Sequence, residues 1–192
     1  MAKKYEFQPD KPYATWLSKL QLTKLQQKQL LKWCLYTLIL LILSVVQDVV
    51  LCRFRIWGGC TELVPCGIFI ICVLEGSQHG CIFALLSSLL YLLSGTAPGP
   101  YVLVLITILS VLAAALRQTY LHPGFFSALL CVTAAMALYE AGVFGFCLLL
   151  GHATFDRYIS FCVPAVLSLA ALPFVYPIAK AISAIGGETW KE

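Results

Sequence analysis

The sequence predicts an all-α integral membrane protein built as a bundle of six transmembrane helices. Hydrophobic residues make up 60% of the chain and charged residues only 11%, whereas a soluble domain carries about a quarter charged residues. The apolar residues gather into six segments, which lie roughly at residues 31–51, 63–74, 79–94, 101–116, 125–150 and 158–185. We therefore expect lipid, and not water, to surround most of the chain.

Three regions follow from the distribution of polar residues. Residues 1–30 are expected to form a cytoplasmic tail and a basic amphipathic helix at the membrane surface, residues 31–187 the six-helix domain, and residues 188–192 a second cytoplasmic tail. The first apolar segment begins only after a long polar stretch and has no small-residue cleavage site behind it. It is therefore expected to be a retained span and not a signal peptide.

A helix is expected from Pro12 to Lys32, where apolar residues alternate with lysines. Lys24, Lys28 and Lys32 stand four residues apart, so they form one stripe along this helix. Anionic lipid headgroups attract such a stripe by about 1 kcal/mol per basic residue. A lipid-facing basic surface and an ordinary solvated helix face are equally good interpretations.

The distribution of positive charge predicts that both termini lie in the cytoplasm. Six spans place ten of the thirteen Lys and Arg residues on the side of the termini and leave Arg53, Arg55 and Arg157 on the other. The segment at 63–74 is short for a span and could instead be a re-entrant hairpin, but the charge split would then be eight against five. The positive-inside rule therefore favours six spans with both termini in the cytoplasm.

Motifs for catalysis, metal binding and cofactor binding are missing from the sequence. It contains no nucleophile elbow, no H-E-x-x-H, no phosphate-binding loop and no dinucleotide-type glycine motif. The predicted topology separates His152 from His79 and His122, and the nine cysteines lie mostly in apolar runs without a C-x-x-C pair. We therefore expect no enzyme, no cofactor and no metal site. The basic tail abuts an apolar segment, which favours a membrane surface over nucleic acid.

Three polar residues fall inside predicted spans, namely Gln47, Asp48 and Glu140. A carboxylate at the bilayer centre costs on the order of 2.5–3.5 kcal/mol, so it normally faces protein or water. A proton or substrate site is one interpretation of Glu140. A structural hydrogen bond between helices is the favoured one, because no relay of further titratable residues accompanies it.

Small residues recur every four positions in two segments. Gly80, Ala84 and Ser88 form one such ridge, and a second is formed by Ala137, Ala141 and Gly145. Ridges of this kind let two helix backbones approach closely in lipid. Both ridges are therefore predicted to pack against another helix, either within the bundle or in a partner protein.

The stretch from about residue 45 to 105 resembles the rod shape-determining MreD family. That family carries a Gln near the outer end of its first helix, Gly-x-x-Pro-Asp-Leu at the start of the second, and Gly-rich turns around a third helix with Gly-Leu-Leu-x-Asp near its end. The stretches "GGCTELVP" and "EGSQHGCIFALLSSLLYLLSGTAPG" supply matching residues: Gln47, Gly59, Glu62, Leu63, Gly76, Gly80, Leu85, Leu86, Gly95 and Gly99. Thr61 and Glu62 replace Pro-Asp, and Ser88 stands where the family has Asp.

The resemblance implies a non-enzymatic scaffold subunit of the peptidoglycan elongation complex, which supports cell shape. Its implied associates are MreC, the actin-like MreB, a SEDS glycosyltransferase and a penicillin-binding transpeptidase. The family is similar in overall fold to the substrate-capture subunits of energy-coupling-factor vitamin transporters, and such a subunit is the alternative function. The first apolar segment lacks the Ala-x-x-x-Ala pair of their docking helix, and the loop "SGTAPGP" is short for a ligand pocket.

Overall fold

The computed structural model describes residues 24–53, 61–120, 124–155 and 158–186. Within these ranges the chain is helical and contains no strand. The helices are α1 (Lys24–Val49), α2 (Leu63–Glu75), α3 (Ser77–Leu93), α4 (Tyr101–Tyr120), α5 (Phe125–Leu149), α6 (Tyr158–Ala170) and α7 (Leu172–Ser183). They occupy the six apolar segments of the sequence, with the last segment divided in two, so the expected all-α class is confirmed.

Helix length and composition support a helical membrane protein with three or four spans in the described part of the chain. α1, α4 and α5 are long and apolar enough to cross a membrane, and α6 with α7 makes a fourth span if the bent pair is counted as one. α2 and α3 are apolar but shorter. Length alone therefore does not establish the six spans that the sequence predicts.

The break between α6 and α7 bends the sixth segment by 54°. Pro173 lies in the first turn of α7, where its missing N–H would have had no partner within that helix. Proline in a continuous helix would instead remove a hydrogen bond and clash with the preceding turn. The chain accordingly restarts its helix at this point, and the Phe174 and Val175 amides both donate to the Ala171 carbonyl at 3.1 Å.

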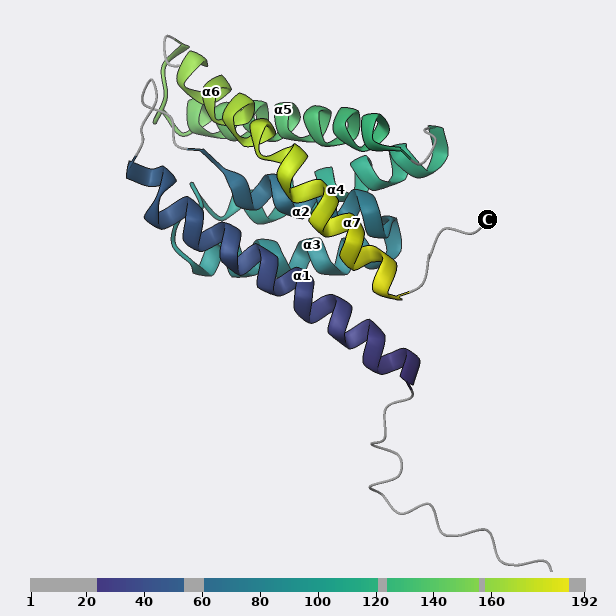
Figure 1. Ribbon diagram of the computed structural model, residues 1–192. Coiled ribbons are helices and arrows are strands. Elements are labelled where there is room, and N and C mark those ends of the chain that lie inside the picture. The colour runs from purple at the N-terminus through teal and green to yellow at the C-terminus, as the bar shows by residue number, and fades with distance from the viewer. Residues whose placement is uncertain (1–23, 54–60, 121–123, 156–157, 187–192) are drawn as a thin grey trace, which may run out of the picture.

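α2 lies at the centre of the bundle and contacts all six other helices (Figure 1). All thirteen of its residues are buried. A helix of this length measures about 20 Å, against about 30 Å for the hydrocarbon core of a bilayer. Its neighbours separate it from lipid, so α2 does not need the length of an independent span.

The connection between α2 and α3 is a single residue, Gly76, whose φ of 86° lies in the region that favours glycine. The two helices then run back alongside each other. A Cβ added at Gly80 would lie 3.1 Å from both the Cα and the carbonyl oxygen of Cys72. Glycine is thus needed at this position because the backbones of α2 and α3 touch.

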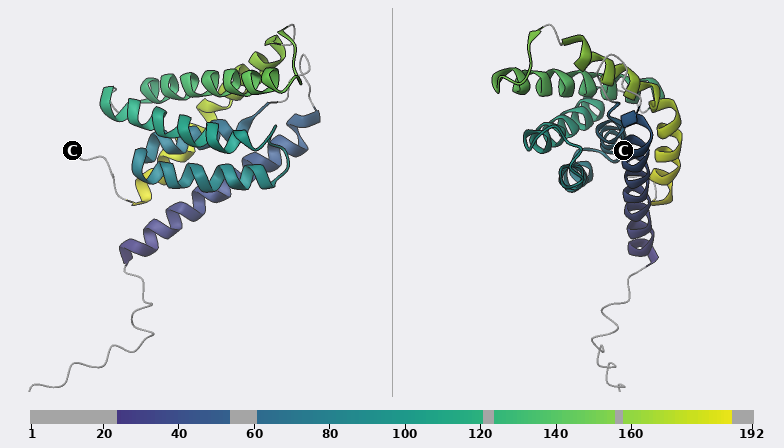
Figure 2. Two further views of the ribbon diagram at one scale, coloured as in Figure 1. Left: turned by 180° about the vertical axis from the view of Figure 1, so that it is seen from behind. Right: turned by 90° about the vertical axis from the view of Figure 1, so that its left-hand side faces the viewer.

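α1 runs obliquely along one side of the bundle, and its N-terminal end projects beyond the other helices (Figures 1 and 2). The helix is continuous from Lys24 to Val49. There is consequently no structural break near residue 30, where the sequence suggested a division between a surface helix and the first span. The expected start of that helix at Pro12 lies outside the described residues.

The ridge of Gly80, Ala84 and Ser88 faces the interior of the bundle. Ala84 and Ser88 are fully buried, and the Ser88 hydroxyl lies 3.5 Å from the hydroxyl of Thr107 on α4. Because Gly80 meets α2 and Ser88 meets α4, this ridge packs within the chain. Of the two alternatives left open by the sequence, the structure shows the internal one.

We expect Ala84→Leu to destabilise the fold by about 1–3 kcal/mol, because a larger side chain overpacks a buried seam. Ala137→Leu is the matched control, since it makes the same change on an exposed face of α5. Thermal unfolding of the purified variants, read beside their membrane yield, measures the difference. Equal stability of the two variants would contradict the internal packing.

Candidate functional site

Polar side chains from distant parts of the chain meet at the N-terminal end of α2. The Val64 amide donates a hydrogen bond to Gln47 Oε1 at 3.0 Å, and the Glu62 amide donates to Ser168 Oγ, also at 3.0 Å. The first amides of a helix have no partner within the helix, and lipid offers none. α1 and α6 therefore supply the acceptors that the start of α2 needs.

The Glu62 carboxylate joins the same cluster to α5. Tyr139 donates its hydroxyl hydrogen to Glu62 Oε2 at 2.7 Å. The next residue, Glu140, is 5% exposed, and its Oε1 has no hydrogen-bond partner among the described residues. We refer to Gln47, Glu62, Tyr139 and Ser168 as the N-end cluster. Two of its members, Gln47 and Glu62, belong to the motif positions that the sequence singled out.

Asp48 and Glu140 do not complete a relay with this cluster in the described structure. Asp48 Oδ2 accepts a hydrogen bond from Ser44 on its own helix at 3.4 Å, while its other oxygen is buried without a partner. The Tyr91 hydroxyl is likewise buried and unpaired within the described residues. Glu140 and Tyr91 are buried and Asp48 is partly buried, and no hydrogen bond among the described residues joins Asp48 to Glu140.

A buried ion pair lies at the C-terminal end of α2. Lys32 Nζ is 2.6 Å from Glu75 Oε2, and the two side chains are only 4% and 2% exposed. Tyr36 donates its hydroxyl hydrogen to Glu75 Oε1 at 2.6 Å. Arg117, on α4, donates to the carbonyl of Val73. We refer to Lys32, Tyr36, Glu75 and Arg117 as the C-end cluster, which brings two cations to the negative end of the helix dipole.

The ion pair corrects the expected stripe of lysines on α1. Lys32 does not lie on a lipid-facing stripe with Lys28, because Lys32 points into the bundle while Lys28 is exposed. The side chain of Lys24 lies outside the described residues. Glu75, the partner of Lys32 at the end of α2, is also only 5% exposed. The physical reason is that each buried charge is compensated by the other, and Tyr36 adds a hydrogen bond to Glu75.

The second small ridge lies on the outside of the described structure. Ala137 and Ala141 are exposed, and a Cβ added at Gly145 would meet no atom within 4 Å. This face of α5 is therefore not covered by the described part of the chain. The ridge remains a candidate contact surface for a partner helix.

The two histidines of the described chain lie in the first turn of α3 and just after the end of α5. His79 stacks against Trp33 with ring centroids 6.4 Å apart, His152 is exposed near the end of α5, and His122 lies outside the described residues. Among the described residues, no group of three or more His, Cys, Asp or Glu side chains is placed to hold a metal ion.

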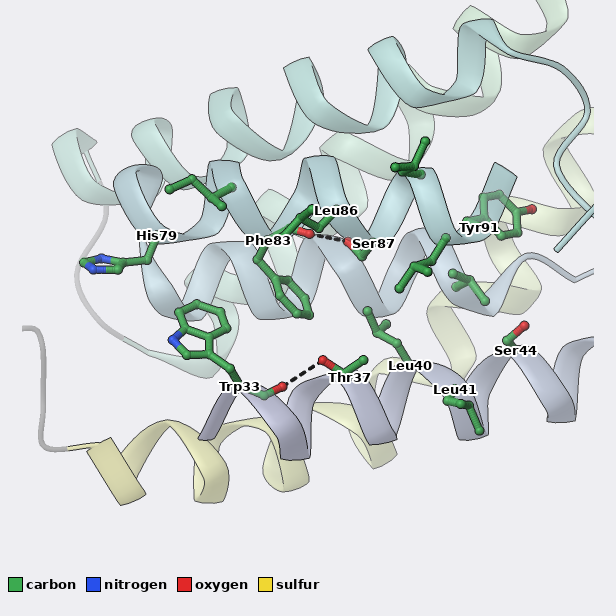
Figure 3. Close-up of a pocket in the computed structure, with 14 residues that line it drawn as sticks. Trp33, Thr37, Leu40, Leu41, Ser44, His79, Phe83, Leu86, Ser87 and Tyr91 are labelled. Carbon is green, nitrogen blue, oxygen red and sulfur yellow. Dashed lines mark hydrogen bonds between the residues drawn. The ribbon is translucent and has the colours of Figure 1, made fainter. Parts of the chain in front are cut away.

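An apolar groove separates α1 from α3 and has a volume of about 730 Å³ (Figure 3). Trp33 and His79 lie at one end of the groove, and Ser44 and Tyr91 lie toward the other. The sequence analysis did not identify this groove. In the sequence, the groove corresponds to large apolar residues in the segments that form α1 and α3. Several of these residues remain exposed among the described helices.

Comparisons with protein-family models, with curated proteins and with solved structures each returned no match.

Breaking the buried ion pair is expected to destabilise the protein. Lys32→Met leaves Glu75 charged and unpaired, which typically costs about 3–5 kcal/mol. The double variant Lys32→Met/Glu75→Leu should recover most of this loss, because replacing both partners by apolar groups is often neutral. Tyr36 keeps an acceptor in the double variant, since its hydroxyl already lies 3.4 Å from the Ala179 carbonyl oxygen.

Lys28→Met is the control for this experiment, because Lys28 lies exposed on the same helix. Thermal unfolding of the three purified variants gives the comparison. A double variant that is no more stable than Lys32→Met would show that the pairing of the two charges is not what matters at this end of α2.

Proposed function

We propose that this chain is a non-enzymatic scaffold subunit of the peptidoglycan elongation complex, of the MreD type. The observation that supports this most is the meeting of two motif positions in space. Gln47, near the end of the first span, accepts a hydrogen bond from the amide of Val64 at the start of α2. Glu62, in the motif position before Leu63, accepts a hydrogen bond from Tyr139 on α5. Residues that carry the resemblance thus hold three helices together.

Two glycines at motif positions of the resemblance are also required by the backbone geometry of the fold. Gly76 supplies the positive φ between α2 and α3, and Gly80 allows the two helices to touch. Glu62 replaces the family's Asp, and the longer side chain still presents a carboxylate that reaches Tyr139. Ser88 replaces a second Asp and binds within the bundle. The motif residues therefore hold helices together and form no reactive site among the described residues, which agrees with a scaffold protein that acts by binding partners.

The proposed location is the bacterial cytoplasmic membrane, with six spans and both termini in the cytoplasm. In this arrangement the short α2 and α3 cross as a hairpin, with α2 at the centre of the bundle and one apolar face of α3 exposed. α6 with α7 forms the last span. The ten-to-three division of basic residues supports this orientation. In this arrangement Lys180, in the last turn of α7, is also one of the basic residues on the cytoplasmic side.

Labelling of single introduced cysteines tests this topology. Sites after Gly99 and Arg157 are expected to react with an impermeant reagent applied to whole cells, and sites after Arg117 and Lys191 only after the membrane is opened. Replacement of the native cysteines by Ala provides the background. A C-terminus labelled from outside would overturn the six-span arrangement.

The proposed partner of first choice is a MreC-type membrane protein, with MreB, a SEDS glycosyltransferase and a penicillin-binding transpeptidase as further associates. Partner helices pack best where small residues let two backbones approach. The exposed ridge of Ala137, Ala141 and Gly145 offers such a surface, and α5 presents it away from the rest of the described chain.

Co-purification with the MreC-type protein encoded by the same organism tests the scaffold function. The unchanged chain is expected to retain this protein on a column. Ala137→Leu is expected to weaken its binding by about fivefold or more, because overpacking a contact costs about 1–3 kcal/mol. Ala181→Leu is the control, since it makes the same change at an exposed site of α7. Both variants should keep normal membrane yield.

The same preparation separates the scaffold from the vitamin-capture subunit. Thermal unfolding is measured with and without each of a set of water-soluble vitamins. A vitamin that raises the unfolding temperature, together with no retention of the MreC-type protein, would replace the proposed function by the alternative. Retention without a vitamin effect is the result expected here.

A further inference from the structure

The hydroxyl groups in the middle of the groove between α1 and α3 do not need a hydrogen-bond partner from a ligand. The Thr37 hydroxyl donates to the Trp33 carbonyl at 2.8 Å, and the Ser87 hydroxyl donates to the Phe83 carbonyl at 2.6 Å (Figure 3). Each hydroxyl is therefore satisfied within its own helix. The remaining lining is almost entirely apolar, and an occupant of the middle of the groove needs only hydrocarbon to fit it.

The length of the groove matches one leaflet of a bilayer. From Trp33 to Ser44 the lining of α1 advances eleven residues, which is about 16 Å of helix. Half of a hydrocarbon core of about 30 Å is about 15 Å. A partner's spanning helix would run about twice as far, whereas an acyl chain of one leaflet ends where the groove ends.

The side chains that line the groove are also of the wrong size for close helix packing. Most of the lining is bulky, as at Leu41, Phe83 and Leu86, and its small side chains are limited to Thr37, Ser44 and Ser87. Helix contacts in lipid favour small residues, as on the exposed ridge of α5. A flexible chain fills the spaces between large side chains better than a helix does, so an acyl chain is the occupant that the lining favours.

The end of the groove at Trp33 and His79 is suited to a phosphate group. α3 begins there, and its preceding residue Gly76 has no side chain to cap the first-turn amides. The start of a helix carries partial positive charge and binds phosphate through its free amides. His79 is exposed and stacks on Trp33, a residue type that often lies at the level of lipid headgroups.

The acidic residue nearest to this turn does not oppose an anion. Glu75 precedes Gly76 in the chain, but it is buried and paired with Lys32. Gln78 is exposed in the first turn, and the Ser77 hydroxyl hydrogen-bonds Gln118 at 2.9 Å. The negative end of α2 lies one residue away, but Lys32 and Arg117 already offset its charge. The mouth of the groove thus combines a positive helix end with the polar side chains of Ser77 and Gln78. This combination is complementary in charge to a phosphate.

We propose that the α1–α3 groove binds one phospholipid from the leaflet at the N-terminal end of α1. An acyl chain lies along the groove, and the phosphate lies at the first turn of α3 beside His79. The lipid fills the space between two helices that barely touch and so holds α1 against the bundle. This site does not depend on the scaffold function, and it is distinct from a general attraction of headgroups to surface lysines.

Quenching of Trp33 fluorescence by brominated acyl chains tests the proposal. The full chain is used in detergent with Trp16, Trp57 and Trp190 replaced by Phe, so that Trp33 alone reports. Brominated phosphatidylglycerol is expected to quench saturably, at a mole fraction roughly tenfold lower than a brominated diacylglycerol with the same chains, because only the former has a phosphate to accept charge-assisted hydrogen bonds.

Three variants locate the site. Thr37→Phe fills the groove and should abolish saturable quenching, whereas Val45→Phe, an exposed site on α1 outside the lining, should retain it. Gln78→Glu places a negative charge at the start of α3. It should weaken binding of the phospholipid but not of the diacylglycerol, while leaving the helix intact because acids are favourable at that end.

Quenching that rises linearly with mole fraction, or that Thr37→Phe leaves unchanged, would show contact with bulk lipid only and would overturn the proposal. Equal quenching by the two lipids would overturn the phosphate site. Light scattering on the same samples excludes another occupant. If the unchanged chain is a dimer that Thr37→Phe converts to a monomer, and lipid does not quench Trp33, a second copy and not a lipid occupies the groove.

Discussion

The structure depends on placing both ends of one short helix out of reach of water. α2 is buried along its whole length, so its free amides and carbonyls need partners from the protein itself. Gln47 and Ser168 serve the first turn, and Arg117 serves the last. The polar residues of an otherwise apolar bundle are therefore concentrated at two levels. Between these levels most contacts are apolar, apart from hydroxyl groups such as those of Ser88 and Thr107, and small residues set the distance between helices.

The apolar segments and the small ridge of α3 could be predicted because both are local patterns. Six runs of hydrophobic residues located the helices, and the spacing of Gly80, Ala84 and Ser88 indicated a face that packs closely. The position of Lys32 could not be predicted in this way. Its spacing from Lys28 suggested a surface stripe, but its partner Glu75 is 43 residues away, and helical periodicity carries no information about contacts between helices.

The N-end cluster illustrates what a sequence motif leaves open. The resemblance identified Gln47 and Glu62 but not the side chains that complete their environment. Tyr139 lies 77 residues after Glu62, and Ser168 lies 106 residues after it. A buried carboxylate requires a hydrogen-bond donor, so the sequence could indicate that a partner exists. Only the packing of α5 and α6 against α2 identifies which residues provide it.

The distance along the chain between Glu62 and Ser168 has a consequence for biosynthesis. A ribosome completes α2 long before α6 emerges, so the first turn of α2 enters the membrane without one of its acceptors. The helix is also too short to cross a bilayer unaided. The α2–α3 hairpin must therefore wait in a protected or hydrated place, such as the insertion machinery or the membrane surface, until the last helices arrive. The hydrogen bonding of the central helix is thus completed only when α6 packs against it.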